Sequence, residues 1–317
     1  MKRLILFCLC LLLSLPMLAC RRPVAVSAVD FVCDTVVTIT AYASQETVDD
    51  AMRLCRAYER RLSKTVEGSD IWNCNHANGE PVTVDPETAD LLRLAKEIAA
   101  LSGCAFDVTI APVSALWNFT ADPPTLPDAD ELEAALEHVN DANLLIDGNT
   151  VTLKNGAQID LGGIAKGYIA DCVASYLKAN GVKHACINMG GNIVVFGGKP
   201  DGTPWTIGIR DPNGTAADSE EVLSLSDGVL VTSGNYERFF LLDGVRYHHI
   251  LDPTTGMPVQ NGLASVTILA DNSALSDALS TACFVLGEQA SKPLLEHYGV
   301  RAIFLYSDGT RSEYPLQ

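Results

Sequence analysis

The sequence lacks several features that would assign it to a special class of protein. It has no internal repeat and no low-complexity segment, and its 48% hydrophobic and 19% charged residues are typical of a folded globular protein. No two cysteines form a C-x-x-C pair, so a zinc or iron–sulfur site has little support. Once Cys8, Cys10 and Cys20 are set aside, most of the other cysteines are expected to be small buried apolar side chains.

Basic residues are also scarce, because 22 Lys and Arg stand against 39 Asp and Glu, a formal net charge of −17. This imbalance argues against nucleic acid or anionic lipid as a partner. An acidic surface also repels a diphosphate, so any nucleotide site in this protein needs a local cation.

The N-terminus predicts export. Lys2 and Arg3 precede an apolar run, Leu4 to Leu15, that is too short to span a bilayer and reads as part of a signal peptide, residues 1–19. Ala19 before Cys20 suits a lipoprotein cleavage site at which the cysteine becomes diacylated; a plain signal peptide with an incidental cysteine is the alternative. Loss of the two basic residues takes the formal charge from −17 to −19. We expect a lipidated tether over residues 20–29 and a folded domain over residues 30–317.

Periodicity predicts an α+β fold of mixed sheets with flanking helices. Helices are expected over residues 48–62, 86–101, 128–139, 163–179, 273–286 and 288–298, with Asp85 as one cap. Strands are expected over residues 31–42, beside the turn 147–149, repeatedly between residues 185 and 251, over residues 264–269, and last over residues 302–306. Helices and strands are interspersed without strict alternation, and the length suits one large domain or two closely packed subdomains.

The densest local signal is Ile159 to Tyr168, a strand end that runs through Gly162 and Gly163 into a helix. Such a turn exposes N–H groups and the positive end of a helix dipole, which favours an anion, and Lys166 adds a full charge. In the alternative, Asp160 caps the helix and Lys166 is a solvated surface charge.

Two further segments contain glycines or histidines near strand ends. Asn188 to Asn192 permits close backbone approach to a ligand, although a tight turn is the favoured explanation. In the pair His248 and His249 only one ring can face a given site, because adjacent strand residues point to opposite faces. The turn sequence that follows places His249 at the mouth of a strand, where it could act as a general base.

Asp277 and Thr281 lie four residues apart on a predicted helix, so a carboxylate and a hydroxyl share one face. Hard cations such as Mg²⁺ prefer such oxygen ligands and need few protein carboxylates. An exposed aspartate and a helix-buried threonine are the alternative.

Taken together, these segments resemble the ApbE family of FAD:protein FMN transferases, from about Asp30 to the C-terminus. The resemblance depends on Ala105 to Thr109, Asp160 to Gly167, Asn188 to Asn192, Thr232 to Gly234, His249 to Gly256, and Asp277 with Thr281. It implies two closely packed subdomains of the ApbE type.

The resemblance also implies roles for particular residues. The Gly163 carbonyl, Asp277 and Thr281 would bind Mg²⁺, and His249 or Asp277 would be the catalytic base. The residues expected to contact FAD are Cys33, Trp72, Ala105, Phe106, Asp107, Asp160, Lys166 and Ile250. Two positions depart from the family pattern: Cys33 and Asp34 replace methionine and glycine, and Gly163 stands where alanine or serine is frequent.

The reaction implied is transfer of FMN from FAD to a threonine or serine hydroxyl of an exported protein, with release of AMP. The expected acceptors are proteins of membrane-associated electron transfer. An FAD pyrophosphatase and a non-catalytic FAD-binding lipoprotein are the alternatives.

Overall fold

The computed structural model describes residues 24–212, 214–215 and 218–314. The predicted signal peptide and the predicted lipidation site Cys20 therefore lie outside the described residues. The tether predicted up to residue 29 is wrong in its second half, because strand β1 (Val26–Val32) already begins at Val26. This strand pairs along its whole length with β2 (Thr35–Ala41), so backbone hydrogen bonding draws these residues into the sheet.

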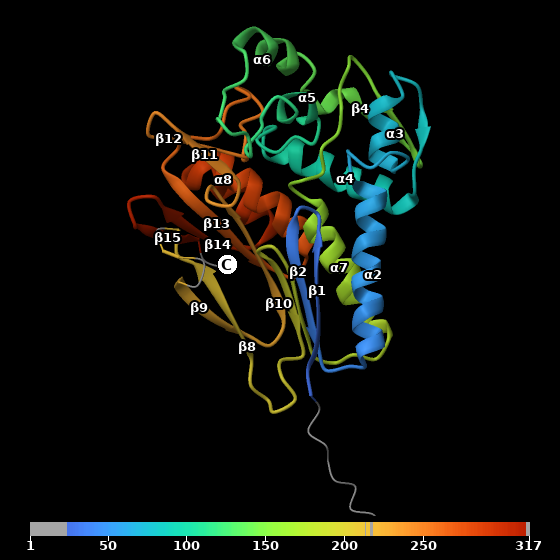
Figure 1. Cartoon of the computed structure of the whole chain (residues 1–317), viewed down its shortest axis with the longest axis vertical. Helices are drawn as coiled ribbons and strands as arrows, with labels where there is room; N and C mark the ends of the chain where they lie inside the picture. The colour runs from blue at the N-terminus through green and yellow to red at the C-terminus, as the bar shows by residue number, and fades with distance from the viewer. Residues whose placement is uncertain (1–23, 213, 216–217, 315–317) are drawn as a thin grey trace, which may run out of the picture.

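An antiparallel sheet of eight strands, in the order β1-β2-β6-β7-β10-β13-β14-β15, forms the centre of the molecule (Figure 1). The remaining strands of this sheet are β6 (Ala185–Met189), β7 (Asn192–Phe196), β10 (Gly228–Gly234), β13 (Leu263–Ala270), β14 (Arg301–Tyr306) and β15 (Arg311–Tyr314). The prediction that the chain closes at residue 306 missed β15, a short polar edge strand with no apolar run to reveal it.

Helices cover one face of this sheet. They are α2 (Gln45–Leu62), α7 (Ala165–Ala179) and α8 (Ser273–Tyr298), which kinks at Gly287. Two more helices pack on these: α3 (Asp70–His76) on α2, and α4 (Pro86–Leu101) on α8. Predicted helix ends are confirmed where a cap was visible, since the Asp85 side chain accepts from the N–H of Glu87. The two helices expected over residues 273–298 are the two halves of α8.

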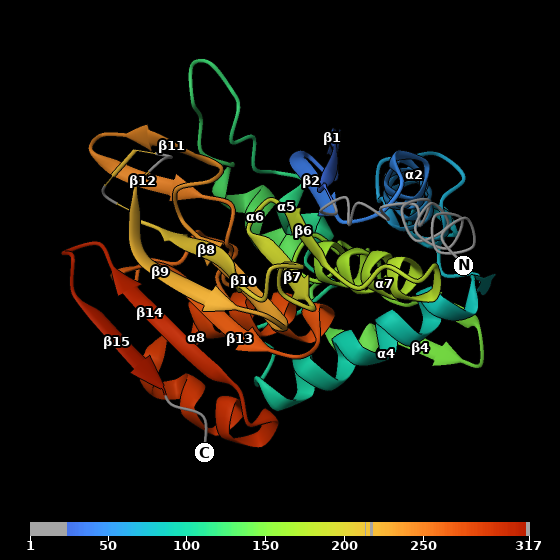
Figure 2. The same cartoon turned by 90° about the horizontal axis from the view of Figure 1, so that it is seen from below.

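A hairpin of β8 (Trp205–Arg210) and β9 (Ser219–Leu225) covers the opposite face of the sheet (Figure 2). Its inward residues Trp205, Ile207 and Ile209 pack on Ile193 and Leu230 in a core of their own. Side chains at successive positions of β7 and β10 therefore face opposite sides of the sheet and belong to different cores.

A smaller region completes the fold beyond one end of the sheet (Figure 1). It contains α5 (Ala111–Ser114), α6 (Ala129–Leu136), η1 (Asp141–Asn143), the hairpin β11 (Phe239–Leu242) and β12 (Val245–His248), and a three-stranded sheet of β3 (Val82–Thr83), β4 (Leu144–Asp147) and β5 (Thr150–Leu153). The predicted turn over residues 147–149 is confirmed.

The α+β class with mixed sheets is confirmed. The largest apolar cluster includes residues of the eight-stranded sheet, such as Val231, and of the three-stranded sheet, such as Leu144, so the two predicted subdomains share one core. Among the residues that the structure describes, no helix has the length and apolar character needed to cross a membrane.

Candidate active site at the crossing of two helices

Asp277 lies where α8 crosses the beginning of α7. Its carboxylate is buried, and Oδ2 accepts a hydrogen bond of 3.0 Å from the backbone N–H of Gly167, in the first turn of α7. No side chain of the preceding residues caps this helix, because the N-cap residue Ile164 has no polar atom in its side chain. A carboxylate from another helix thus stabilises the positive end of the α7 dipole. Asp277 is therefore not the exposed aspartate of the structural alternative.

Gly163 and Thr281 come together beside this carboxylate. A Cβ atom at Gly163 would lie 3.3 Å from Thr281 Oγ1 and 3.0 Å from the Phe106 ring. The loop before α7 therefore passes directly over the hydroxyl of α8, and the Phe106 ring borders the same point. The three residues predicted to bind Mg²⁺ are neighbours in space.

Lys166 is at the centre of the charges around this point. Its Nζ lies 3.6 Å from Asp277 Oδ1 and donates a hydrogen bond of 3.0 Å to the carbonyl of Gly162. Burial dominates the pKa shifts of Cys33 and His249, and the nearby Lys166 charge opposes the rise at Cys33 and adds to the fall at His249. The Lys166 side chain is mostly buried and faces Asp277, so it is not a fully solvated surface charge, and its predicted contact with FAD stays a prediction.

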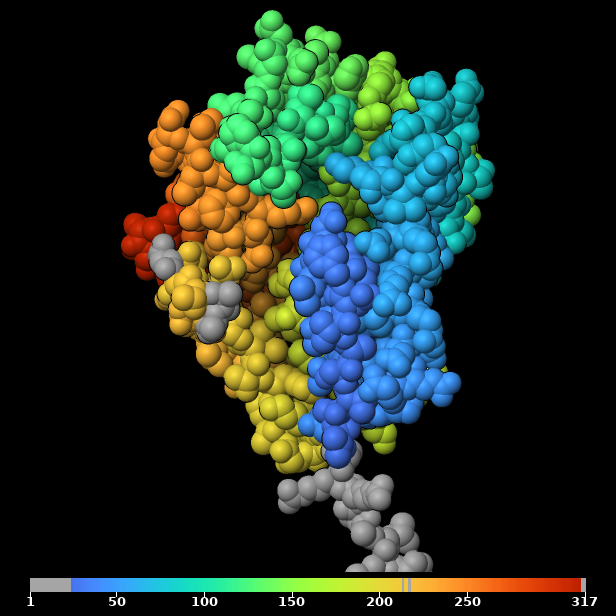
Figure 3. Space-filling view, viewed as in Figure 1, coloured from blue at the N-terminus to red at the C-terminus, as the bar shows by residue number. Residues whose placement is uncertain are grey.

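Cys33 lies at the tip of the β1–β2 hairpin. Cys33 and Asp34 both have positive φ, the conformation of a two-residue type I′ turn, and the Cys33 N–H donates to Glu59 Oε1 at 2.7 Å. Burial, followed by the Glu59 charge, raises the pKa of the Cys33 thiol to about 12, so the thiol is neutral. The surface is hollowed between this hairpin tip (blue), the segment around α3 (cyan) and the segment around β11 and β12 (orange) (Figure 3).

The two histidines have separate environments, although only His248 belongs to strand β12. His248 is buried, with Nε2 2.8 Å from the carbonyl of Val259, and it packs edge-on against Phe284. His249 follows the end of β12, and its Nδ1 lies 3.4 Å from the carbonyl of Arg238. Because a carbonyl only accepts, Nδ1 carries the proton and Nε2 keeps a free lone pair.

His249 is neutral at physiological pH. Burial, followed by the charges of Arg238 and Lys166, lowers its pKa to about 3. The pKa values of the free enzyme govern kcat/KM. We therefore expect kcat/KM for FAD to show no inflection from this imidazole between about pH 5 and 8. Measuring the pH profile checks this, and an acid limb near the ordinary histidine value of 6.5 would contradict it.

Asp160 belongs to a partly buried polar cluster beside the loop before α7. Its Oδ2 accepts from Lys64 Nζ at 2.6 Å and from Ser114 Oγ at 2.9 Å, and its Oδ1 accepts from the Gly162 N–H at 2.9 Å. Burial alone would raise the pKa of Asp160, but the Lys64 charge and these hydrogen bonds hold it below its usual range. Asp160 therefore fixes the glycine turn, and it does not cap α7. The segment before it is not a strand, since it forms a single bridge at Gln158.

Lys64 was not found from the sequence, because it follows α2 with no motif around it. Lys64→Met leaves the Asp160 carboxylate without its cation, so we expect the free energy of unfolding at pH 7 to fall by about 1–3 kcal/mol. The contribution exists above the unperturbed aspartate pKa of 3.8 and is lost as pH falls. Denaturant unfolding should thus show a difference in free energy of unfolding between the wild-type protein and Lys64→Met. This difference should be constant from pH 7 to about 5 and should become smaller in stronger acid. Lys154→Met, which removes an exposed lysine, is the control, and a difference no larger than the control's would contradict the prediction.

Asp107 has an evident structural role. Its Oδ1 accepts from the N–H and hydroxyl of Thr109 at 2.8 and 2.7 Å, and its Oδ2 accepts from the Asp141 N–H at 3.0 Å. Burial raises the pKa of this carboxyl despite these bonds. The hydrogen bonds that Asp107 accepts hold the loop that follows Ala105 and Phe106. The FAD contacts predicted for Ala105, Phe106 and Asp107 stay predictions.

Trp72 lies on α3, stacked on His76 with 4.0 Å between ring centroids. Asn75 on the same helix binds Ile159 on both sides, donating to its carbonyl at 2.8 Å and accepting from its N–H at 2.6 Å. This pair of bonds holds α3 against the residue before Asp160, and no motif in the sequence predicts it. Ile250 is buried in the main core. FAD contacts at Trp72, Asp160 and Ile250 also stay predictions.

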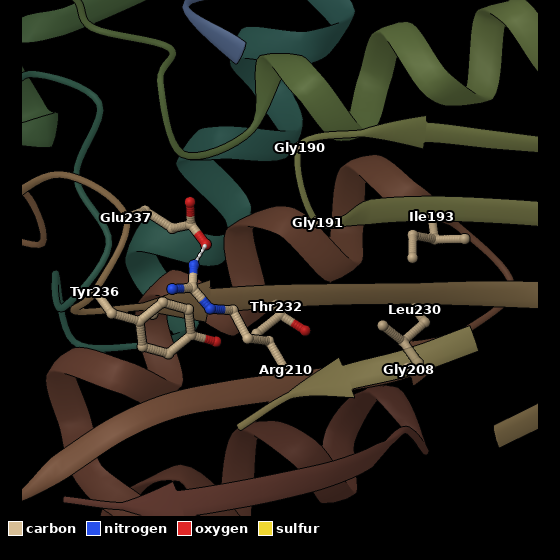
Figure 4. A pocket seen from close by; sticks show the side chains of 10 residues that line it. Gly190, Gly191, Ile193, Gly208, Arg210, Leu230, Thr232, Tyr236 and Glu237 are labelled. Carbon is tan, nitrogen blue, oxygen red and sulfur yellow. Dashed lines mark ion pairs between the residues drawn. The ribbon is translucent and has the colours of Figure 1, made fainter. Parts of the chain in front are cut away.

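The glycines of Asn188 to Asn192 form the turn between β6 and β7, so the structural alternative for that segment accounts for them. They border a separate hollow with Gly208, Arg210, Thr232 and Tyr236 (Figure 4). Within it Arg210 lies over the Tyr236 ring and 3.5 Å from Glu237. Thr232 faces this hollow while its neighbour Ser233 contacts α8, so the hollow lies on the opposite side of β10 from Thr281.

The donors around Asp277 suit a hard divalent cation. They are one carboxylate and one hydroxyl, beside the backbone of Gly163, which matches the preference of Mg²⁺ for oxygen and for few protein carboxylates. No group of three or more His, Cys, Asp and Glu residues forms a metal cluster in the described part of the chain. This donor set is of a different kind, with a single carboxylate, and it fits Mg²⁺.

The fold is α+β, and its candidate site places the carboxylate of Asp277 and the hydroxyl of Thr281 beside the beginning of α7. A model of the ApbE family matches residues 33–304, and the chain belongs to this family. The family resemblance seen in the sequence is thus confirmed.

Relatives and solved structures agree with this assignment. An "FAD:protein FMN transferase" of Treponema pallidum is 39% identical over 279 residues, 82% of this chain and 77% of the relative. The crystal structure of the ApbE protein from Thermotoga maritima has 36% identity and a TM-score of 0.83, covering 91% of this chain and 96% of that one. The flavin transferase ApbE from Vibrio cholerae has 31% identity and a TM-score of 0.82, covering 92% and 96%.

Proposed function

We propose that the protein transfers the FMN half of FAD to a threonine or serine hydroxyl of another protein, with Mg²⁺ as cofactor. The observation that supports this most is the convergence of Gly163, Asp277 and Thr281 beside Lys166. The Gly163 carbonyl, the Asp277 carboxylate and the Thr281 hydroxyl would hold the metal. When bound, Mg²⁺ would neutralise charge on the diphosphate oxygens.

The remaining groups have roles that follow from their environments. The acceptor hydroxyl oxygen bonds to the FMN-side phosphorus as the phosphorus–oxygen bond to AMP breaks, and AMP leaves with the bridging oxygen. Lys166 and the first turn of α7 stabilise the negative charge of the phosphates. His249 Nε2 accepts the hydroxyl proton, because this lone pair is free. Asp277 is the alternative base, although its oxygens already face Gly167 and Lys166.

A mass measurement tests the transfer. Purified protein, FAD, Mg²⁺ and an exported flavoprotein domain are mixed, and the acceptor is expected to gain one FMN less water. Free FMN and AMP with an unmodified acceptor would identify an FAD pyrophosphatase. No turnover, with flavin release unchanged in Asp277→Ala, would identify a binding protein.

We also propose that the protein is exported and anchored in the membrane through a diacylated Cys20, facing the extracytoplasmic side. The argument comes from the residues before the folded domain. Its acceptors are then exported flavin-binding proteins of membrane-associated electron transfer. Cys20→Ser should move the protein from the membrane fraction to the soluble exported fraction.

A further inference from the structure

Three hydroxyl groups form a chain between β10 and α8. Ser233 Oγ on β10 lies 3.3 Å from Thr281 Oγ1 and 2.7 Å from Ser280 Oγ, both on α8. Ser280 Oγ in turn donates a hydrogen bond of 2.9 Å to the main-chain carbonyl of Asp277. Ser280 is fully buried, so the row of hydroxyl groups is closed to water at its Ser280 end.

The carbonyl at its end fixes the direction of the whole chain. A carbonyl oxygen can only accept, so the single proton of Ser280 points to Asp277. Ser280 Oγ therefore accepts the proton of Ser233, and Ser233 Oγ is left to accept the proton of Thr281. Each hydroxyl has one proton and two lone pairs, so no other arrangement makes all three bonds.

We infer that Ser233 is a positioning residue that orients the Thr281 hydroxyl for cation binding. With its proton committed to Ser233, Thr281 Oγ1 keeps its lone pairs for other partners, and the backbone of Gly163 lies beside it. A hydroxyl free to rotate would spend part of its time with its proton toward the cation, which repels it. This inference rests on the proposed function, because it concerns the residues that would hold Mg²⁺.

Metal affinity tests the inference without reference to turnover. Mn²⁺ binding is followed by electron paramagnetic resonance with FAD present and no acceptor protein. Ser233→Ala should weaken Mn²⁺ binding by about tenfold, the effect typical of groups that orient a metal ligand. Ser280→Ala should also weaken it, because Ser233 can then turn its proton toward Thr281.

Coupling between the variants separates an oriented chain from independent packing effects. The double variant Ser233→Ala/Ser280→Ala should bind Mn²⁺ no more weakly than Ser233→Ala alone, and Ser233→Ala should have no effect on a Thr281→Val background. Ser276→Ala is the control: its hydroxyl donates only to the Asn272 carbonyl, at 2.7 Å, one turn earlier on α8. This control should keep the affinity of the wild-type protein.

Two outcomes would overturn the inference, and they differ in what else they affect. If the wild-type protein transfers FMN while Ser233→Ala keeps its Mn²⁺ affinity within about twofold, the chain does not orient Thr281 and the proposed function stands. If the wild-type protein neither binds Mn²⁺ nor transfers FMN, the proposed function fails and the inference fails with it.

Discussion

Asp277→Asn is expected to lower the rate of FMN transfer by about 10²–10³-fold, while the protein stays folded. Asparagine has the same shape and keeps an oxygen for the Gly167 N–H, so the packing of α8 on α7 survives. The variant loses the negative charge that faces Lys166 at 3.6 Å and would hold the cation. Removing one preorganised electrostatic group from an active site has effects of this size.

A single-turnover assay at saturating FAD, with intact mass of the acceptor as readout, measures this loss. Asp171→Asn is the matched control, because Asp171 is also a helix-capping carboxylate at the same helix crossing. Its oxygens accept from the N–H groups of Ser273 and Ala274, at the beginning of α8. We expect the control to lose stability and keep transfer. Equal losses of transfer in both variants would mean that the Asp277 charge matters only for folding.

The local elements of the fold could be predicted because their signals are local. Asp85 followed by Pro86 predicts the beginning of α4, and the turn at Gly148 predicts a hairpin. The strand β1 was missed in part because Val26 to Val29 alternate between exposed and half-buried positions and have no continuous apolar run. Its pairing with β2 is what makes it a strand, and pairing is a tertiary property.

The site could be predicted only where a residue type already implied its chemistry. Asp277 and Thr281 were recognisable from their helical spacing, and Lys166 from the glycines before it. Lys64 and Asn75 reach Asp160 and Ile159 across separations of 96 and 84 residues. No periodicity connects residues so far apart. The direction of the hydroxyl chain was equally hidden, because it depends on which carbonyl lies at its end.

Gly167→Ala is expected to damage both stability and transfer, because Gly167 is the point at which α7 and α8 touch. A Cβ atom there would lie 2.1 Å from the main-chain oxygen of Ser273 and 2.8 Å from Asp277 Cβ. A backbone oxygen cannot rotate away as a side chain can, so the two helices must separate. Overpacking of this kind costs about 1–3 kcal/mol, and chemical denaturation measures it as a lowered free energy of unfolding.

The comparison with Gly163→Ala shows why this effect depends on position and not on glycine as such. At Gly163 the added methyl group would meet only side chains, the Phe106 ring at 3.0 Å and the Thr281 hydroxyl at 3.3 Å, and these can shift by a few tenths of an ångström. We expect Gly163→Ala to unfold at nearly the same denaturant concentration as the wild-type protein. Gly167→Ala should unfold earlier and, because the N–H that binds Asp277 moves away with α7, should also transfer FMN more slowly. Similar behaviour of the two variants would mean that the close helix crossing does not hold Asp277 in place.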